Sequence, residues 1–291
     1  MKHINRLDGR VALVSGAGSG VGRAYAKSLA AEGARVIVND YSLPSARQVA
    51  EEIVATGGVA QPNGEDVANF EASGRIVEHA LDAFGSIDIL IANAGIIRPG
   101  YIHEMAADDW AQVMAVHANG TFNCYRHAVP HMIRKAGGTI ITTGAKPIDK
   151  YFPGLAAYRA AKAAILVLTL NGARELADHN INVNSIMPGA TATPMQQRYM
   201  DSLIKRGVNI DQNWPKAVPA ESVPPLGIFL CTEAGRRFSG YSFYLLGGAI
   251  SVSTSYGTLG SVETTDPAWN QDALAEKIPA LLQQVQNTQS R

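Results

Sequence analysis

The chain has 291 residues, of which 46% are hydrophobic and 17% charged. This balance is ordinary for a globular protein and argues against an intrinsically disordered chain. Lys and Arg together number 25, as do Asp and Glu, so no basic field is available to hold nucleic acid or anionic lipid.

Residues 1–9 are polar, and the longest apolar run, 163–170, is too short to span a bilayer. Cys124 and Cys231 cannot form a disulfide framework and have no metal-ligand spacing around them. We therefore predict a cytoplasmic protein without a metal, a nucleic-acid partner or a membrane partner.

Short β-branched runs alternate with longer amphipathic stretches along the chain, a pattern typical of βαβ units. The continuous apolar run over 11–14 indicates a strand that is covered on both faces. Apolar residues at helical spacing indicate helices beginning near Val21 and near Trp110, the second reaching His117. We expect an α/β fold, with a doubly wound parallel sheet of about seven strands and helices on both faces. The remaining strands are predicted at 35–38, 58–60 (weaker), 87–91, 139–143, 181–186 and 241–246.

No repeat, low-complexity linker or internal domain boundary interrupts residues 1–250. We predict one catalytic domain over this range, followed by a C-terminal extension over 251–291. The extension begins Ser/Thr/Gly-rich, and its residues 267–286 have the pattern of one amphipathic helix.

A glycine-rich segment follows the first predicted strand directly and leads into a helix. Its glycines allow a tight turn and close approach of the backbone to a pyrophosphate, which binds at the helix N-terminus. The same composition fits a plain strand-to-helix turn, but the position after the first strand favours a dinucleotide site. No Gly-Lys-Ser/Thr follows, which argues against a Walker-type site. The predicted binding residues are Gly16, Ser19, Gly20, Val21 and Gly22.

Asp40 ends the second predicted strand, about 20 residues beyond the loop, where a carboxylate can accept the ribose hydroxyls of NAD. The same charge would repel the 2′-phosphate of NADP, and neither Ser19 nor Tyr41 offers a compensating cation. The alternative is an ordinary solvated carboxylate at a strand end. Together with the loop, Asp40 predicts NAD as the cofactor.

Tyr158 and Lys162 lie four residues apart in the helical segment 156–164, so their side chains share one helix face. An ammonium beside a phenol favours phenolate and lowers the phenol pKa from about 10 towards neutrality. Such a phenol can exchange a proton with an alcohol or ketone. Taken alone, a pair at this spacing is more often a surface pair.

Together these residues resemble the classical short-chain dehydrogenase/reductase family over about residues 8–250. The resemblance implies a Rossmann-type fold, and Gly16, Gly20 and Gly22 match the family's TGxxxGxG, with Ser15 in place of Thr. The other family motifs follow in order: the adenine-contacting Asp66-Val67, Asn93-Ala94-Gly95 from NNAG, Tyr158 and Lys162 from YxxxK, and Pro188-Gly189 followed by Thr191 and the nicotinamide-contacting Thr193.

Two segments, 38–40 and 116–122, narrow the resemblance to multifunctional 3-hydroxyacyl-CoA and 17β-hydroxysteroid dehydrogenases, in which the position of His117 is also His. The characteristic insertion of that subgroup after the second strand is absent here, so its substrate does not carry over.

The resemblance also implies a substrate lid over about 194–220, whose apolar residues suit a hydrophobic small molecule. These are Met195, Tyr199, Met200, Leu203 and Trp214.

Assembly is predicted from the helices at 109–135 and 154–179, which carry apolar residues on more than one face. A helix that is apolar nearly all round must be buried on both sides. One side meets the sheet and the other plausibly meets a second subunit, as in the family's tetramers, so we predict a homotetramer. The residues concerned include Val113, Phe122, Ile165, Leu166 and Leu168.

The chain departs from the family at Ala145, which stands where the family has its catalytic serine, thirteen residues before Tyr158. That serine donates a hydrogen bond to the reacting oxygen, a contact worth about 10²–10³ in rate. Three explanations are open: the substrate supplies its own internal hydrogen bond, another residue replaces the serine, or the chain is an engineered Ser→Ala variant. Thr143, on the same strand face, is the best internal candidate. His117 could also donate, take the place of the family's Asn in a proton relay behind Lys162, or be a satisfied core residue.

The resulting functional hypothesis is an NAD-dependent oxidoreductase that interconverts a secondary alcohol and its ketone. Tyr158 would be the acid/base, supported by Lys162, and NAD favours the oxidative direction. The alternative from another class is a catalytically impaired dinucleotide-binding sensor or assembly protein, which Ala145 supports. A third is epimerisation or dehydration with a tightly held cofactor on the same scaffold.

Overall fold

The apolar run before the glycine loop forms strand β1 (Val11–Ser15), in which every residue is buried. The computed structural model describes residues 6–146, 152–210, 216–246 and 249–253. Within them, seven further strands join β1 in one sheet: β2 (Arg35–Asn39), β3 (Val59–Asn63), β4 (Ile89–Ala92), β5 (Gly138–Thr143), β6 (Ile181–Pro188), β9 (Ser242–Leu246) and β10 (Ala249–Ser253). Two short strands, β7 (Thr191–Ala192) and β8 (Val218–Pro219), pair separately.

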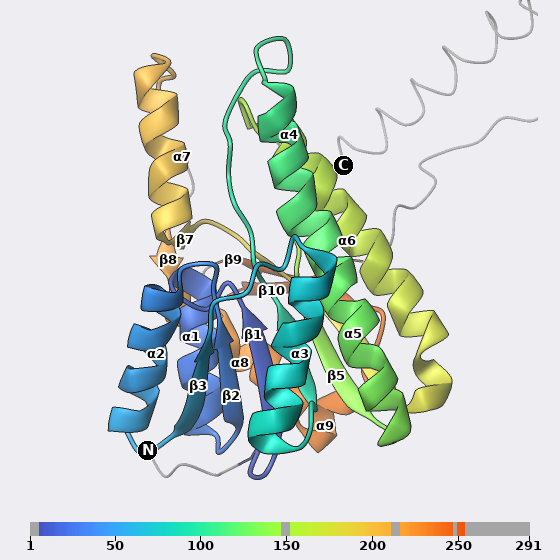
Figure 1. The fold of residues 1–291 in the computed structure, drawn as a ribbon. Coiled ribbons are helices and arrows are strands. Elements are labelled where there is room, and N and C mark those ends of the chain that lie inside the picture. Colours follow the sequence, from blue (N-terminus) through green and yellow to red (C-terminus); the bar gives the residue numbers. More distant parts are fainter. Residues whose placement is uncertain (1–5, 147–151, 211–215, 247–248, 254–291) are drawn as a thin grey trace, which may run out of the picture. The chain divides into compact units, whose positions relative to one another are not determined.

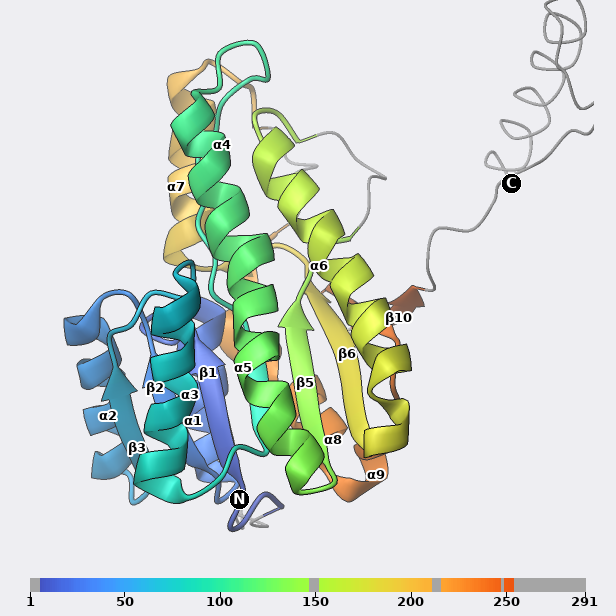
Figure 2. The same ribbon diagram turned by 45° about the vertical axis from the view of Figure 1, so that its right-hand side comes forward.

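Helices cover both faces of the sheet, as the burial of β1 requires (Figures 1 and 2). Buried residues of α1, α2 and α8 pack on one face, and those of α3, α5 and α6 pack on the other. The helices are α1 (Gly20–Ala31), α2 (Leu43–Ala55), α3 (Phe70–Phe84), α4 (Ala107–Met114), α5 (Gly120–Arg134), α6 (Ala156–Glu175), α7 (Pro194–Lys205), α8 (Pro224–Cys231) and α9 (Glu233–Arg236).

Local sequence fixes several helix ends. The Ser42 hydroxyl accepts a hydrogen bond from the Ser45 amide at the start of α2, and Asn69 Oδ1 accepts one from Ala72 at the start of α3. Both residue types are favoured N-caps because they satisfy an amide that has no partner within the helix. Helix α3 ends at Gly85, whose φ of 76° is left-handed and costs glycine little.

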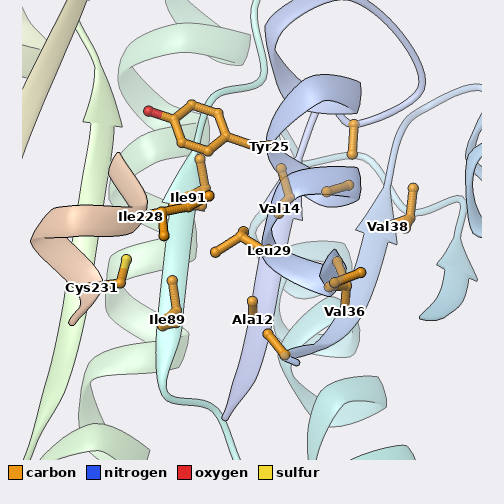
Figure 3. Packing of buried hydrophobic residues seen from close by; sticks show 14 of the residues in the cluster. Ala12, Val14, Tyr25, Leu29, Val36, Val38, Ile89, Ile91, Ile228 and Cys231 are labelled. Atoms are coloured by element: carbon orange, nitrogen blue, oxygen red, sulfur yellow. The ribbon is translucent and has the colours of Figure 1, made fainter. Parts of the chain in front are cut away.

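The core on the α1 side joins the central strands to two helices (Figure 3). Leu29 of α1 is fully buried against strand residues such as Ile89, and Ile228 belongs to the same cluster from α8. Burial of each such side chain is worth about 1.5–3 kcal/mol. This packing sets α1, and with it the glycine loop, against the end of β1.

The strand order is β10-β9-β6-β5-β4-β1-β2-β3, and all pairings are parallel except that between β9 and β10. The chain therefore runs outwards from β1 in both directions, with a switch point between β1 and β4. Open α/β sheets bind ligands at the carboxyl ends of the strands at this point. The predicted doubly wound fold is confirmed.

The sheet has eight strands in place of the seven predicted, because the C-terminal tail adds β10 as an antiparallel edge strand. Ile250 and Val252 are 58% and 54% exposed, so β10 lacks the buried apolar pattern by which strands are recognised. The predicted domain boundary after residue 250 falls within β10, and the helix predicted at 267–286 lies outside the described residues.

The helix predicted from Trp110 through His117 is interrupted by one π-turn, Ala115–Asn119, between α4 and α5. Such turns are rare and occur frequently at functional sites. No helix in the described part of the chain is long and apolar enough to cross a membrane.

Candidate active site

The glycine loop presents the N-terminus of α1 at the end of β1. Gly20 has a φ of +54°, and a Cβ on Gly22 would lie 2.1 Å from the Gly16 carbonyl oxygen, so a side chain would displace backbone here. Ser19 occupies the N-cap position of α1, yet within the described chain its side chain makes no capping hydrogen bond. The first amides of α1 therefore face the loop without a side-chain cap, an arrangement suited to a phosphate.

Asp40 is held against this loop from the end of β2. Its Oδ2 accepts a hydrogen bond of 2.9 Å from the Gly18 amide, and its Oδ1 accepts one of 2.9 Å from the Ser42 amide. A Cβ on Gly18 would approach the carboxylate to 2.8 Å. The carboxylate is thus fixed by backbone donors beside the loop.

Asn93 ties together the ends of three strands. Its side-chain amide donates to the Ser15 carbonyl at 3.0 Å, and its backbone amide donates to Ser15 Oγ at 3.0 Å. Ser15 therefore supplies the hydroxyl of the family's Thr. Thr143 Oγ1 donates to Asn93 Oδ1 at 3.2 Å, so the hydroxyl proton of Thr143 is already used.

Tyr158 and Lys162 of α6 both line the cavity beneath the loop. Lys162 is 4% exposed; its Nζ donates to the Thr143 carbonyl at 2.5 Å and lies 5.5 Å from the centre of the Tyr158 ring. Burial lowers the pKa of Lys162 to about 7.

The pKa of Tyr158 moves opposite to the direction that the Tyr–Lys spacing predicts. Burial raises it to about 12 in the protein alone, and the charge of Arg159 offsets only part of the rise. The Tyr–Lys spacing reflects only the attraction between an ammonium and a phenolate. Here desolvation also weakens the charge of Lys162 itself, so removal of water outweighs the attraction.

His117 is fully buried within the π-turn. Its ring stands edge-on to that of Tyr158 with 5.3 Å between centroids, and its Nε2 lies 3.0 Å from the Ile96 amide and 2.8 Å from the Ile96 carbonyl oxygen. One ring nitrogen can bond only one of these groups at a time. Nδ1 has no hydrogen-bond partner among the described residues. Burial, reinforced by the charge of Lys162, lowers the pKa of His117 to about 3, so the ring is neutral.

One cavity of about 420 Å³ joins the glycine loop to the Tyr158 region. Sixteen predicted site residues contribute to its walls: Gly16, Ser19, Gly20, Val21, Asp40, Asn93, Gly95, His117, Thr143, Ala145, Tyr158, Lys162, Pro188, Gly189, Thr191 and Thr193.

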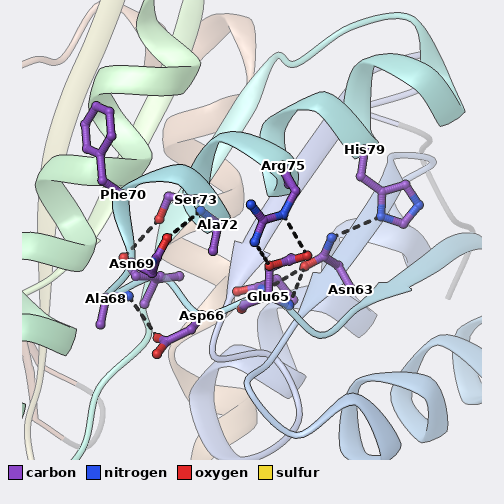
Figure 4. Close-up of polar contacts among 12 residues, drawn as sticks. Asn63, Glu65, Asp66, Ala68, Asn69, Phe70, Ala72, Ser73, Arg75 and His79 are labelled. Atoms are coloured by element: carbon purple, nitrogen blue, oxygen red, sulfur yellow. Dashed lines mark hydrogen bonds and ion pairs between the residues drawn. The ribbon is translucent and has the colours of Figure 1, made fainter.

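Four predicted residues do not line the cavity: Gly22, Ala94, Asp66 and Val67. Gly22 packs on the back of the loop, and the Ala94 amide donates to Ser15 Oγ at 3.1 Å. Figure 4 shows Asp66 turned to the start of α3, where its Oδ1 accepts a hydrogen bond of 2.9 Å from the Ala68 amide. The Val67 carbonyl accepts from Asn123 Nδ2 at 2.9 Å.

The predicted lid follows Thr193, whose Oγ1 caps α7 by accepting from the Gln196 amide at 3.1 Å. The lid residues Met195, Tyr199, Met200 and Leu203 belong to one apolar cluster that includes Phe152 and Tyr158. Helix α7 therefore packs beside the predicted acid/base. Trp214 lies outside the described residues.

The sequence did not single out Phe152, Arg159, Arg198 and Tyr244 as site residues, although all four line the cavity. Lys146 also lines the cavity. The available signal was adjacency, since Lys146 follows Ala145 and Arg159 follows Tyr158.

Comparison with known proteins places this site in a family. The family model described as short chain dehydrogenase matches residues 10–203. Cyclohexanol dehydrogenase from an Acinetobacter species is 35% identical over 192 residues, which cover 66% of this chain and 76% of that protein. Peroxisomal multifunctional enzyme type 2 from Mus musculus is 36% identical over 88% of this chain, but the chain spans only 34% of its length.

Among solved structures, a short chain dehydrogenase from Mycobacterium avium superposes with a TM-score of 0.83 at 33% identity, covering 96% of each chain. The chain belongs to the short-chain dehydrogenase family. Its relatives include dehydrogenases and reductases acting on alcohols or ketones, and members of the family use NAD(P)(H).

Proposed function

We propose that the protein is an NAD-dependent oxidoreductase that interconverts a secondary alcohol and its ketone. The main support for this proposal is that Tyr158 and Lys162 line the same cavity as the glycine loop and Asp40. The relative named cyclohexanol dehydrogenase supports a secondary alcohol as the substrate class.

The loop fits a dinucleotide in three respects: the uncapped amides of α1, the close backbone packing at Gly22, and the fixed carboxylate of Asp40. The loop would hold the pyrophosphate, Asp40 the adenosine ribose, and Lys162 and Thr193 the nicotinamide end. When bound, NAD supplies a hydride acceptor, and its reduced form a hydride donor. Because Asp40 would face the 2′-phosphate of NADP, NAD is the proposed cofactor.

Tyr158 moves the proton. Its raised pKa keeps the phenol protonated at neutral pH, which is the form that donates to a ketone oxygen. In the oxidative direction the phenol oxygen must accept the alcohol proton, so alcohol oxidation should accelerate as pH rises. Lys162 favours that step to the extent that it is charged, and the Thr143 carbonyl holds its Nζ in place. His117, neutral and with an unpartnered Nδ1, is the proposed next group in a proton relay behind Lys162.

Ala145 lines the cavity but offers no hydroxyl to the reacting oxygen. Thr143 is bonded to Asn93 and would have to give up that bond to replace the serine. This observation supports the second candidate, a catalytically impaired dinucleotide-binding protein. The retained Tyr158 and Lys162 favour the enzyme, since binding alone requires no proton path.

The deciding experiment is Tyr158→Phe, which keeps the ring and removes only the ionisable hydroxyl. We expect NADH formation across a panel of secondary alcohols to fall by about 10²–10⁴-fold, while the Kd for NAD changes little. Tyr241→Phe, which lies outside the cavity walls, is the matched control. If Tyr158→Phe keeps most of the activity, the proton path is misassigned; if the unaltered protein binds NAD and oxidises no alcohol, the second candidate is correct.

We also propose a homotetramer. Of the residues from which the assembly was predicted, Val113, Ile165 and Leu166 are buried within the subunit, whereas Phe122 of α5 is 48% exposed. Trp110 of α4 and Val167 of α6 are also exposed, at 41% and 47%. Large exposed apolar side chains of this kind suit burial by a second subunit. Light scattering at micromolar concentration should give a tetramer mass, and a monomer mass would exclude the arrangement.

A further inference from the structure

The cavity differs in charge between its two ends. We call the walls formed by Lys146, Phe152, Arg159, Arg198 and Tyr244 the substrate end. Of the described residues that line the cavity, the only carboxylate is Asp40, which is fixed at the glycine loop. The cations are Lys162 beside Tyr158 and three at the substrate end, Lys146, Arg159 and Arg198.

Arg159 is held in a defined orientation beside Tyr158. Its guanidinium donates a hydrogen bond of 2.6 Å to the Lys146 carbonyl and lies over the Phe152 ring, 4.8 Å from the ring centre. Its charge also opposes the burial-driven rise in the pKa of Tyr158, which places it near the acid/base. A guanidinium carries five N–H donors in a planar fork that matches carboxylates and phosphates.

Lys146 and Arg198 approach the same space from other segments. Lys146 follows Ala145, and its Nζ lies 5.0 Å from the centre of the Tyr244 ring. Arg198 comes from α7, is exposed, and forms no ion pair with any residue that the structure describes. The three cations therefore come from three separate parts of the chain and meet at one end of one cavity.

We infer that the substrate carries an anionic group, a carboxylate or a phosphate, on the side of the molecule bound at the substrate end. Arg159, Lys146 and Arg198 bind this group, while Phe152 and Tyr244 contact the apolar body. Charge-assisted hydrogen bonds in a partly desolvated site are about twice as strong as neutral ones, so the anion would orient the carbinol towards Tyr158. The inference rests on the proposed function for the position of the reacting carbon, but not for the binding of the anion.

The test compares anionic and neutral probes of one shape. The full-length protein saturated with NADH is titrated calorimetrically with benzoate, phenyl phosphate and benzamide. At least one anion should bind about tenfold or more tightly than benzamide, and the tighter anion identifies carboxylate or phosphate as the source. Benzamide binding as tightly as both anions, or no binding by either anion, overturns the inference.

Matched variants locate the binding. Arg159→Gln and Arg198→Gln should each weaken binding of the anionic probe by about tenfold and leave benzamide unchanged. The controls are Arg174→Gln on α6 and Lys205→Gln on α7, two exposed cations on the same helices outside the cavity walls. An equal loss in the controls would mean that general surface charge attracts the anion, and would overturn the assigned site.

Tyr158→Phe separates this inference from the proposed function. It should bind the anionic probe as the unaltered protein does while its alcohol turnover falls by about 10²–10⁴-fold. Anion preference combined with turnover independent of Tyr158 would overturn the proposed chemistry and leave the anion site standing. Turnover that needs Tyr158 without any anion preference would overturn the anion site alone.

Discussion

The two ends of the cavity are built in different ways. The glycine-loop end consists of backbone in close contact: Asp40 is fixed by two amides, and Gly22 packs where no Cβ fits. The substrate end consists of side chains from α6, α7, β9 and the segment after β5. A side chain added at Gly22 would displace backbone, whereas a change at the second end replaces one side chain. Specificity can therefore change at the substrate end without disturbing the dinucleotide site.

Ala145→Ser, in the cavity wall next to the substrate end, is the change from which we expect the largest effect. It restores a hydroxyl beside Tyr158, and the Thr143 hydroxyl is already bonded to Asn93, so kcat for an accepted alcohol should rise by about 10²-fold. Steady-state NADH formation with saturating NAD measures it.

Thr143→Val is the companion variant, because it removes the only other strand hydroxyl proposed for this role. If Ala145→Ser gives no gain and Thr143→Val lowers kcat, then Thr143 already polarises the reacting oxygen. If neither change alters turnover, the reacting oxygen lies elsewhere.

His117, between the two ends, should make stability depend on pH. Its folded pKa of about 3 lies below the unfolded value of 6.5, so the unfolded chain takes up a proton first as pH falls. The contribution of the neutral ring to the free energy of unfolding is fully present above pH 6.5. It decreases below that pH, by about 2 kcal/mol at pH 5. Urea unfolding at pH 7.5 and pH 5 should show this loss in the unaltered protein and not in His117→Asn.

The comparison of the two proteins cancels groups that titrate in both, including His131 and the Asp88 carboxylate, whose pKa values are also lowered. Asn can serve both the amide and the carbonyl of Ile96. Identical acid sensitivity in the two proteins would contradict the neutral, buried state of His117.

Asp40→Ser tests the glycine-loop end and should have the smallest effect. Removal of a charge beside the predicted ribose site should cut the preference for NADH over NADPH by about tenfold, read from the two Kd values. Asp66→Asn, whose carboxylate lies outside the cavity walls, should alter both affinities alike. Equal affinity of the unaltered protein for both nucleotides would refute the proposed choice of cofactor.

Local spacing explains what the sequence could predict. The loop from Gly16 to Gly22, Asp40 after β2 and the Tyr158–Lys162 pair each depend on residues close together in the chain. The α/β order follows in the same way, because buried strands such as β1 alternate with amphipathic helices.

Features that depend on distant segments or on opposing energies were not predictable. The cations of the substrate end come from the segment after β5, from α6 and from α7, and only folding brings them together. The sequence indicates Thr143 as the best replacement for the serine, but in the structure its hydroxyl is bonded to Asn93. The pKa of Tyr158 depends on the attraction of nearby cations, which the sequence indicates, and on burial away from water, which the sequence does not indicate.

Gly95 makes the size of the residue at position 117 matter to the loop after β4. A Cβ on Gly95 would lie 2.3 Å from Cε1 of the buried His117 imidazole, so a side chain at position 95 would have to displace the ring. A Gly95→Ala substitution should therefore cost less stability in a chain with a smaller residue at 117 than in the unaltered protein.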